Sequence, residues 1–133
     1  MIPVYAGAVV SASDRRVLCQ LRDDKPDIIC PGLWVCCPGG HINKSERPID
    51  GIVRELREEF EIEVKNLKTL MTHKEDSREF QGLYHAFYAD LSTPVEKVKC
   101  NEGQRAEFFR PENALRLSQH PISLIFLKAF MKI

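Results

Sequence analysis

The sequence predicts a single domain of the α/β (α+β) class over residues 1–133. Short β-prone segments separated by turn signals occur along much of the chain, which indicates a sheet. Residues 48–60 and 121–131 instead repeat their apolar side chains at helical spacing. With 133 residues, 44% hydrophobic and 29% charged, the chain has the size and composition of one globular domain with one core.

The segments before residue 48 are predicted to form strands. Residues 4–10 are small, apolar and β-prone, and the polar residues 13–16 predict a turn into a second strand at 17–22. A short apolar run follows at residues 33–37. We expect this run to be a strand that ends in a glycine turn at residues 38–40.

A helix is predicted over residues 48–60. Pro48 suits the first helical position, where a missing N–H has no consequence, and Asp50 places negative charge at the positive end of the helix dipole. The apolar residues that define one side of this helix are Ile49, Ile52, Val53, Leu56 and Phe60.

Three more strands and a second helix are predicted after residue 60. The strands cover residues 67–71, 83–91 and 106–109, and the helix covers residues 121–131. The apolar stripe of this helix could pack inward or against a second copy of the chain, and we expect it to pack inward. Its residues are Ile122, Ile125, Phe126, Ala129 and Phe130.

Composition and charge argue against several classes of protein. The 19 Lys and Arg residues equal the 19 Asp and Glu residues, and no basic block stands out, so long nucleic acid is not an expected partner. No apolar run is long enough to cross a bilayer, and the first residues lack a signal-peptide layout. We therefore expect a cytoplasmic protein without a membrane partner.

The cysteines and two aromatic residues are expected to belong to the core. The cysteines form an odd set without paired Cys-x-x-Cys spacing, which predicts neither a disulfide framework nor a zinc site. Trp34 and Phe108 could stack on a base, but aromatic residues in strands are mostly core residues. The cysteines are Cys19, Cys30, Cys36, Cys37 and Cys100.

The helix predicted over residues 48–60 carries an unusual acidic face. Glu55, Glu58 and Glu59 are spaced at i, i+3 and i+4, so three carboxylates share the side opposite the apolar stripe. Each like-charge pair destabilises an isolated helix by roughly 0.2–0.5 kcal/mol. A hard divalent cation such as Mg²⁺ would offset this repulsion, since it prefers oxygen ligands. Gly51, one turn earlier, could leave room there for a ligand.

The residues in front of this helix make the pattern specific. The chain resembles the Nudix box, Gly-x5-Glu-x7-Arg-Glu-U-x-Glu-Glu-x-Gly-U with U apolar, and is similar to MutT-like members of the Nudix hydrolase family. Residues 17–22, 31–34, 38–40 and 102–109 resemble segments that flank the box in such enzymes. The residues that match the box are Gly40, Glu46, Arg54, Glu55, Leu56, Glu58, Glu59 and Ile62.

The resemblance implies both a fold and an activity. The fold is the Nudix fold, an α/β/α sandwich with a mixed central β-sheet. The activity is that of a Mg²⁺-dependent pyrophosphohydrolase, in which water attacks phosphorus and cleaves a diphosphate bond in a nucleoside diphosphate linked to another moiety. Mn²⁺ could replace Mg²⁺. The short chain favours a nucleoside triphosphate or similarly compact small-molecule nucleotide, while sugar nucleotides and dinucleoside polyphosphates stay open as substrates. The enzyme is expected to be a monomer or a homodimer.

The resemblance also implies roles for individual residues. Glu58 and Glu59 are the expected principal metal ligands, joined by Glu55 and the Gly40 carbonyl. Arg54 is expected to orient a neighbouring carboxylate. The general base is either Glu55 or Glu102. Glu46 is expected to pair with the arginine or to fix the loop near the substrate, and Gly39 is an expected substrate contact. Independently of the resemblance, Arg22 lies near the end of a strand and before a loop, which makes it the expected phosphate contact outside the box.

Two positions depart from the family pattern, and two other functions compete with hydrolysis. Glu61 stands where the box has glycine, which leaves the end of the helix open, and Ser45 replaces a frequent glycine.

A catalytically weak Nudix-fold module that senses nucleotides is the main alternative, but it would be expected to lack some of the carboxylates. A nucleic-acid-binding domain would require a basic face. His41 could touch substrate or could have no special task.

Overall fold

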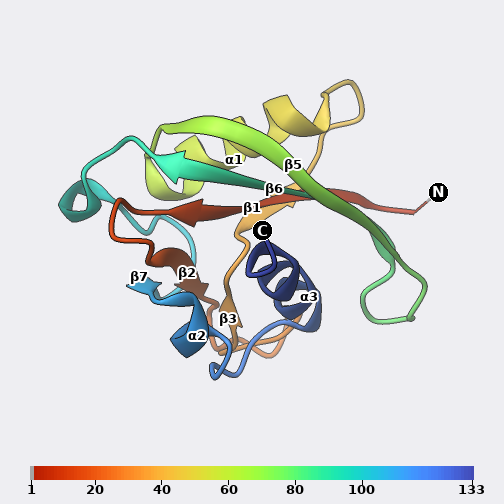
Figure 1. The fold of residues 1–133 in the computed structure, drawn as a ribbon. Coiled ribbons are helices and arrows are strands. Elements are labelled where there is room, and N and C mark those ends of the chain that lie inside the picture. The colour runs from red at the N-terminus through yellow and green to blue at the C-terminus, as the bar shows by residue number, and fades with distance from the viewer. Residues whose placement is uncertain (1) are drawn as a thin grey trace.

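The computed structural model describes residues 2–133 and contains a mixed sheet of seven strands. β1 is parallel to β6 along its whole length, and the other strand pairs are antiparallel. The spatial order is β3-β2-β1-β6-β5, with β4 paired to β1 and β7 paired to β2 (Figure 1). The strands are β1 (Val4–Ser11), β2 (Val17–Leu21), β3 (Trp34–Val35), β4 (Gly39–His41), β5 (Val64–Glu75), β6 (Gly82–Leu91) and β7 (Arg105–Phe109).

Two helices cover opposite faces of the sheet. In Figure 1, α1 (Pro48–Phe60) lies behind β1 and β6, and α3 (Pro121–Phe130) lies in front of them. The strand alternation of β1 divides its side chains between these helices, because Ala8 and Val10 belong to the core cluster of α1 and Val9 to that of α3. The α+β class and the mixed sheet predicted from the sequence are therefore confirmed.

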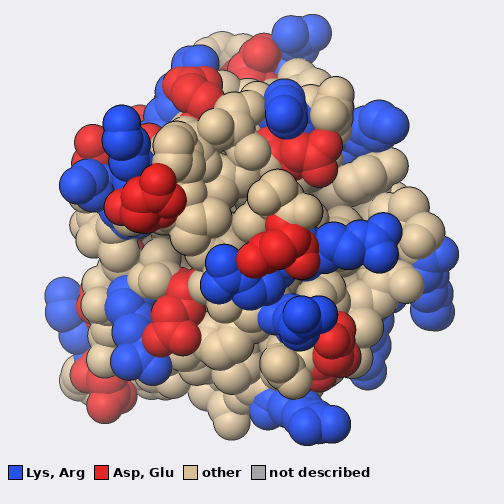
Figure 2. Space-filling view, turned by 60° about the vertical axis from the view of Figure 1, so that its left-hand side comes forward, with Lys and Arg blue, Asp and Glu red and all other residues tan. Residues whose placement is uncertain are grey.

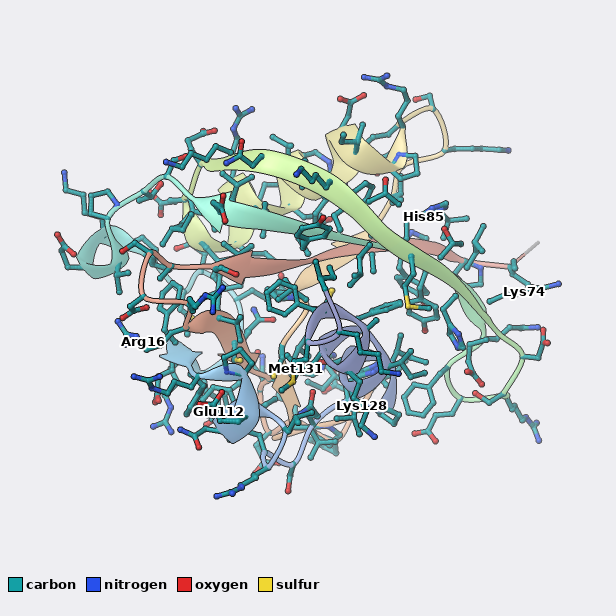
Figure 3. The ribbon with its side chains drawn as sticks, viewed as in Figure 1. Arg16, Lys74, His85, Glu112, Lys128 and Met131 are labelled. Atoms are coloured by element: carbon teal, nitrogen blue, oxygen red, sulfur yellow. The ribbon has the colours of Figure 1, made fainter. Side chains whose placement is uncertain are left out.

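The second helix packs inward, as predicted. Ile122 and Phe126 are buried in the core, and Ile125 and Phe130 pack against it. Lys128 and Met131 lie on the exposed side of this end of the chain (Figure 3). None of the helices between residues 2 and 133 has the length and apolar character needed to cross a membrane.

Some elements differ from the prediction in extent. β5 extends beyond the predicted strand at 67–71 in both directions, and its pairing with β6 contains two register shifts. The short helices η1 (Val95–Lys97) and α2 (Pro111–Ala114) were not predicted, since a single turn shows no periodicity.

The predicted glycine turn at residues 38–40 is wrong, because Gly39 and Gly40 belong to strand β4. This strand pairs with β1, with Ala6 opposite Gly40 and Gly7 opposite Gly39. A Cβ atom on Gly39 would lie only 1.9 Å from the Ala6 carbonyl oxygen, so the backbones approach more closely than any other residue allows. Glycine here permits tight pairing rather than a turn.

The burial predicted for the cysteines is confirmed for four of the five, and the two aromatic residues pack in the core as predicted. All five cysteines are free, and all but Cys100 are buried. Trp34 is buried and meets the ring of Phe109 edge to face, with centroids 5.1 Å apart. Phe108 is half-buried and packs against the core cluster of α1.

Helix α1 ends where the family glycine is missing. Pro48 is its first residue, and its last, Phe60, is followed by Glu61 in the left-handed region at φ 54° and ψ 41°. The Glu61 N–H donates to the Arg57 carbonyl, and its side chain accepts a hydrogen bond from Asn101. The helix therefore keeps a glycine-like end, at the conformational cost of a residue with a Cβ atom.

Glu61→Gly is expected to stabilise the protein by about 0.5–1 kcal/mol, because it relieves the left-handed strain while giving up one exposed hydrogen bond. Chemical denaturation with a two-state fit measures this change. Glu63→Gly is the matched control, since Glu63 has no positive φ, and it should destabilise. A lower free energy of unfolding for Glu61→Gly would contradict the strain argument.

Candidate active site

Strand β4 and helix α1 bring the first carboxylate of the site onto a glycine. The missing Cβ of Gly40 leaves space that the Glu55 carboxylate fills, since a Cβ there would lie 2.8 Å from Glu55 Oε2. The Glu55 side chain is only 13% exposed. The backbone of β4 and the acidic face of α1 are thus in direct contact.

Gly51 provides the space for a second carboxylate. A Cβ on Gly51 would lie 3.0 Å from Glu46 Oε1, so the room beside this helical glycine is taken by Glu46 and not by a ligand. Glu46 Oε1 also accepts a hydrogen bond from the Asn43 backbone N–H at 3.1 Å. This bond fixes the loop between β4 and α1.

Arg54 connects the carboxylates of the site. Its Nε and Nη2 donate to Glu46 at 2.8 and 3.0 Å, which is a bidentate pair. Its Nη1 lies 3.1 Å from both Glu55 Oε1 and Glu58 Oε2, and its Nη2 also donates to the His41 carbonyl at 3.2 Å. Glu46 keeps the pKa of its carboxyl below the usual value through the bonds from Arg54 and Asn43.

Glu59 is the buried member of the acidic face. It is 6% exposed, and its Oε2 has no hydrogen-bond partner in the described structure. Burial raises the pKa of its carboxyl to about 9, and Glu55, Glu102 and Glu58 add to the increase. An unpartnered buried carboxylate beside like charges is unfavourable unless a cation or a proton offsets it.

The loop after η1 is tied to the end of α1. Asn101 donates from its backbone N–H to the Glu59 carbonyl and from its side chain to the Glu58 carbonyl. The next residue, Glu102, is exposed, and its carbonyl accepts a 2.6 Å bond from Gln20 on β2. These contacts place the Glu102 charge close enough to influence Glu59.

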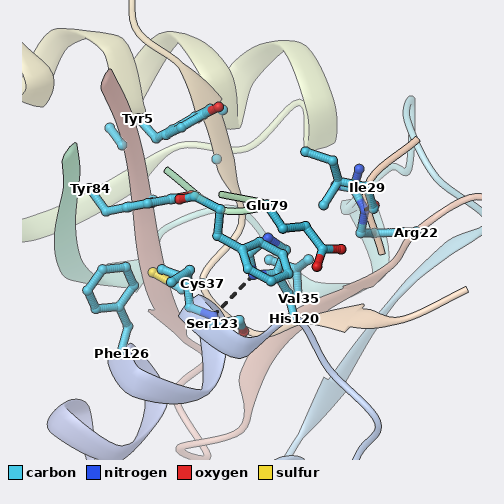
Figure 4. A pocket seen from close by; sticks show the side chains of 16 residues that line it. Tyr5, Arg22, Ile29, Val35, Cys37, Glu79, Tyr84, His120, Ser123 and Phe126 are labelled. Atoms are coloured by element: carbon cyan, nitrogen blue, oxygen red, sulfur yellow. Dashed lines mark hydrogen bonds between the residues drawn. The ribbon is translucent and has the colours of Figure 1, made fainter. Parts of the chain in front are cut away.

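A cavity of about 200 Å³ opens on the other side of β4. It lies between β1, β3, β4, the β5–β6 connection and the start of α3 (Figure 4). Gly39 and Gly40 line it, so the strand in contact with Glu55 also forms a wall of the cavity. Its polar and aromatic lining includes Tyr5, Arg22, Glu79, Tyr84, His120 and Ser123.

The structure brings the predicted site residues into two adjoining groups. Glu46, Arg54, Glu55, Glu58 and Glu59 form a cluster on α1 and the loop before it, with Glu102 beside it. Arg22, Gly39 and Gly40 line the cavity, whereas His41 is exposed at the end of β4.

Sequence reasoning missed most of the cavity. Glu79, Tyr84 and His120 come from segments that are far apart in the sequence and share no motif. The only available signal was the position of His120 before Pro121 and a helical stripe, which is typical of a helix N-cap.

The acidic cluster fits a divalent cation in its donor chemistry. Hard cations take carboxylate oxygens, and the unpartnered Oε2 of Glu59 next to Glu55 is such a donor. Between residues 2 and 133, no three acidic, His or Cys side chains are already gathered as a metal site, since Arg54 engages Glu55 and Glu58 in ion pairs.

One face of the molecule shows the mixed charge expected from the neutral composition. On the face drawn in Figure 2, Lys and Arg side chains alternate with Asp and Glu side chains, and no continuous basic area is seen. This face offers no track for a nucleic-acid backbone.

Known proteins resemble the chain over nearly its full length. Residues 1–130 match the model of the NUDIX domain. The CTP pyrophosphohydrolase of Escherichia coli (strain K12) is 30% identical over 132 residues, which are 98% of this chain and 92% of that protein. Hydrolases of this family generally use divalent metal ions.

Solved structures share the fold. The MutT protein from Methanosarcina mazei Go1 superposes with a TM-score of 0.78 at 20% identity, over 98% of this chain and 93% of that one. The NUDIX domain of Shewanella oneidensis NrtR, complexed with ADP ribose, gives a TM-score of 0.79 at 16% identity, over 99% and 88%. The family match, the E. coli relative and the common architecture agree, and the chain belongs to the NUDIX domain family as a MutT-like hydrolase.

Proposed function

We propose that the enzyme hydrolyses the diphosphate linkage of a nucleoside triphosphate or a similarly compact nucleotide, with Mg²⁺ as its cofactor and Mn²⁺ as a possible substitute. The observation that carries the proposal is the shared strand β4. A base in the cavity would leave its phosphates over Gly39 and Gly40, next to Glu55 and the acidic cluster. The CTP pyrophosphohydrolase activity named for the E. coli relative supports a triphosphate substrate.

Glu58 and Glu59 would be the principal metal ligands, and Glu55 and the Gly40 carbonyl would be the other ligands from the protein. A bound divalent ion neutralises phosphate oxygens and lowers the pKa of bound water. This role explains why Glu59 is kept as a buried carboxylate without a protein partner, which would otherwise destabilise the fold.

The remaining groups position and activate the reactants. Arg54 fixes Glu46, Glu55 and Glu58 in one network, so each carboxylate has a defined direction. Water adds OH to one phosphorus atom, the bond from that atom to the bridging oxygen breaks, and a carboxylate takes the proton. We favour Glu55 over Glu102 as this base because Glu55 is confined against Gly40, whereas Glu102 is exposed.

Incubation with Mg²⁺ and the common nucleoside triphosphates, followed by product identification, tests the function. We expect a nucleoside monophosphate and pyrophosphate from at least one of them. In the same assay, Glu55→Gln should lower kcat by about 10²- to 10⁴-fold and Glu102→Gln by less, if Glu55 is the base. The absence of turnover for every triphosphate would contradict the proposed function, and the reverse order of the variants would assign the base to Glu102.

A further inference from the structure

The cavity has room for one small planar group. Its volume of about 200 Å³ lies below the roughly 300–1,000 Å³ typical of pockets that enclose whole ligands. Aromatic side chains form one wall, where the rings of Tyr5 and Tyr84 stack with centroids 4.8 Å apart. A base fits such a space, while sugar and phosphates would remain outside it, toward Gly39 and Gly40.

His120 presents a hydrogen-bond donor of fixed position in this cavity. Its Nδ1 accepts the backbone N–H of Ile122 at 3.1 Å and thereby caps α3. Because Nδ1 accepts, the proton of the neutral imidazole is on Nε2. Nε2 has no hydrogen-bond partner among residues 2–133, and the Phe80 ring packs edge to face on the imidazole at 4.9 Å.

The imidazole stays neutral under ordinary conditions. Burial, with a smaller contribution from the Arg22 charge, lowers the pKa of His120 to about 4. The charged residues that share the cavity are Arg22 and Glu79. Above pH 5, His120 is therefore a donor at Nε2 and an acceptor at Nδ1. The two nitrogens keep these roles because the Ile122 N–H requires an acceptor at Nδ1.

Glu79 supplies an acceptor in the same cavity. It lies on the β5–β6 connection, directly before Phe80, which packs on His120. It lines the cavity, and Figure 4 shows its carboxylate in the region of His120 and Arg22. Its side chain is exposed and forms no ion pair within the described residues, so it is free to accept a hydrogen bond from a ligand.

We propose that His120 and Glu79 together select nucleotides whose base pairs a 4-amino group with N3, as in cytosine, or a 6-amino group with N1, as in adenine. This inference rests on the proposed function. Cytosine and adenine offer an amino donor to Glu79 and a ring-nitrogen acceptor to the Nε2–H of His120. Uracil and guanine have a carbonyl oxygen and a ring N–H at these positions. The carbonyl oxygen would face the Glu79 carboxylate, which is also an acceptor, and the ring N–H would face the Nε2–H of His120, which is also a donor.

The values of kcat/KM for CTP, ATP, UTP and GTP test the proposal on the wild-type enzyme. We expect CTP and ATP to exceed UTP and GTP by at least about tenfold, because an unpaired polar group in a cavity costs roughly 1–3 kcal/mol. Equal values for the four, or a preference for UTP and GTP, would overturn the selection while leaving the proposed function intact. Failure to hydrolyse any of them would overturn both.

Variants of His120 separate base selection from helix capping. His120→Ser and His120→Asp both keep an oxygen that can cap α3, so the fold should persist. Serine removes the imidazole Nε2–H, and the preference for CTP over UTP should shrink about tenfold. Aspartate replaces the donor with an acceptor, so that CTP and UTP each keep one matched and one mismatched group, and the preference for CTP should be abolished. An unchanged ratio of CTP to UTP in both variants would contradict the assignment.

Two further measurements exclude a purely structural effect. Ribose 5-triphosphate carries no base, so its hydrolysis by His120→Ser should match that by the wild type. A similar loss on this compound would show that the change acts through the fold. Glu79→Gln changes an exposed residue with little risk to folding and should also reduce the CTP preference. An unaltered preference would remove Glu79 from the proposal.

Discussion

Glu59→Gln is expected to lower kcat for nucleotide hydrolysis by about 10²- to 10³-fold and, at the same time, to raise the melting temperature of the metal-free protein at pH 8. The loss of activity follows from removing a charged ligand at the acidic cluster, where a metal ion contributes several kcal/mol to the transition state. The gain in stability follows because the buried Oε2 of Glu59 has no protein partner.

The pH dependence of this gain is set by the raised pKa of Glu59. Burial and the neighbouring carboxylates raise that pKa from 4.5 to about 9 in the folded chain. Between these values the unfolded chain is ionised while the folded chain retains the proton, so the free energy of unfolding falls as pH rises through this window. Glutamine has no proton to lose, and its variant should escape this decline.

Thermal melts in EDTA at pH 5 and pH 8 measure this difference. We expect similar melting temperatures for wild type and Glu59→Gln at pH 5 and a higher melting temperature for the variant at pH 8. In a domain of this size, each kcal/mol of added stability raises the melting temperature by about 3–5 °C. Glu63→Gln alters an exposed carboxylate paired with Arg57 and serves as the control. A lower melting temperature for Glu59→Gln at pH 8 would refute the claim that Glu59 is destabilising without metal.

Arg54→Lys is expected to lower kcat by about 10- to 100-fold, although the positive charge is kept. Lysine cannot reproduce the bidentate pair with Glu46 together with the bonds to Glu55, Glu58 and the His41 carbonyl. The carboxylates would then lose their fixed directions. The melting temperature should also fall by several degrees, because the Glu46 and Glu55 side chains are only 15% and 13% exposed.

Arg57→Lys is the matched control for this variant. Arg57 lies on the same helix and forms an ion pair with Glu63, but both side chains are 59% exposed. Exposed pairs contribute little, so kcat and melting temperature should stay near wild type. If Arg54→Lys behaved like Arg57→Lys in steady-state kinetics and thermal melts, the network around Arg54 would have no part in catalysis.

The sequence predicted the acidic half of the site because its residues lie in one continuous stretch. Glu46, Arg54 and Glu59 occur at intervals that one loop and one helix convert directly into neighbours. Helical spacing thus carries the geometry without knowledge of the rest of the chain. The same local logic predicts the start of α1 at Pro48, whereas the sequence leaves its end at Phe60 open because Glu61 replaces the family glycine.

The cavity could not be predicted because tertiary packing assembles it. Tyr5, Glu79 and His120 lie on β1, the β5–β6 connection and the residue before α3, and only the parallel pairing of β1 with β6 and the packing of α3 bring them together. The local sequence predicts a turn at the glycine pair 39–40, since the close approach of these residues to β1 depends on a partner strand that the local sequence does not identify.

The central claim is that the acidic face of α1 binds a divalent metal ion. Electron paramagnetic resonance tests it most directly, by measuring Mn²⁺ binding to the wild type and to Glu59→Gln in the presence of a non-hydrolysable nucleoside triphosphate. We expect the wild type to bind Mn²⁺ and Glu59→Gln to bind it at least about tenfold more weakly, with Glu63→Gln unchanged. Equal Mn²⁺ affinity for the wild type and Glu59→Gln would contradict a metal site on the acidic face of α1.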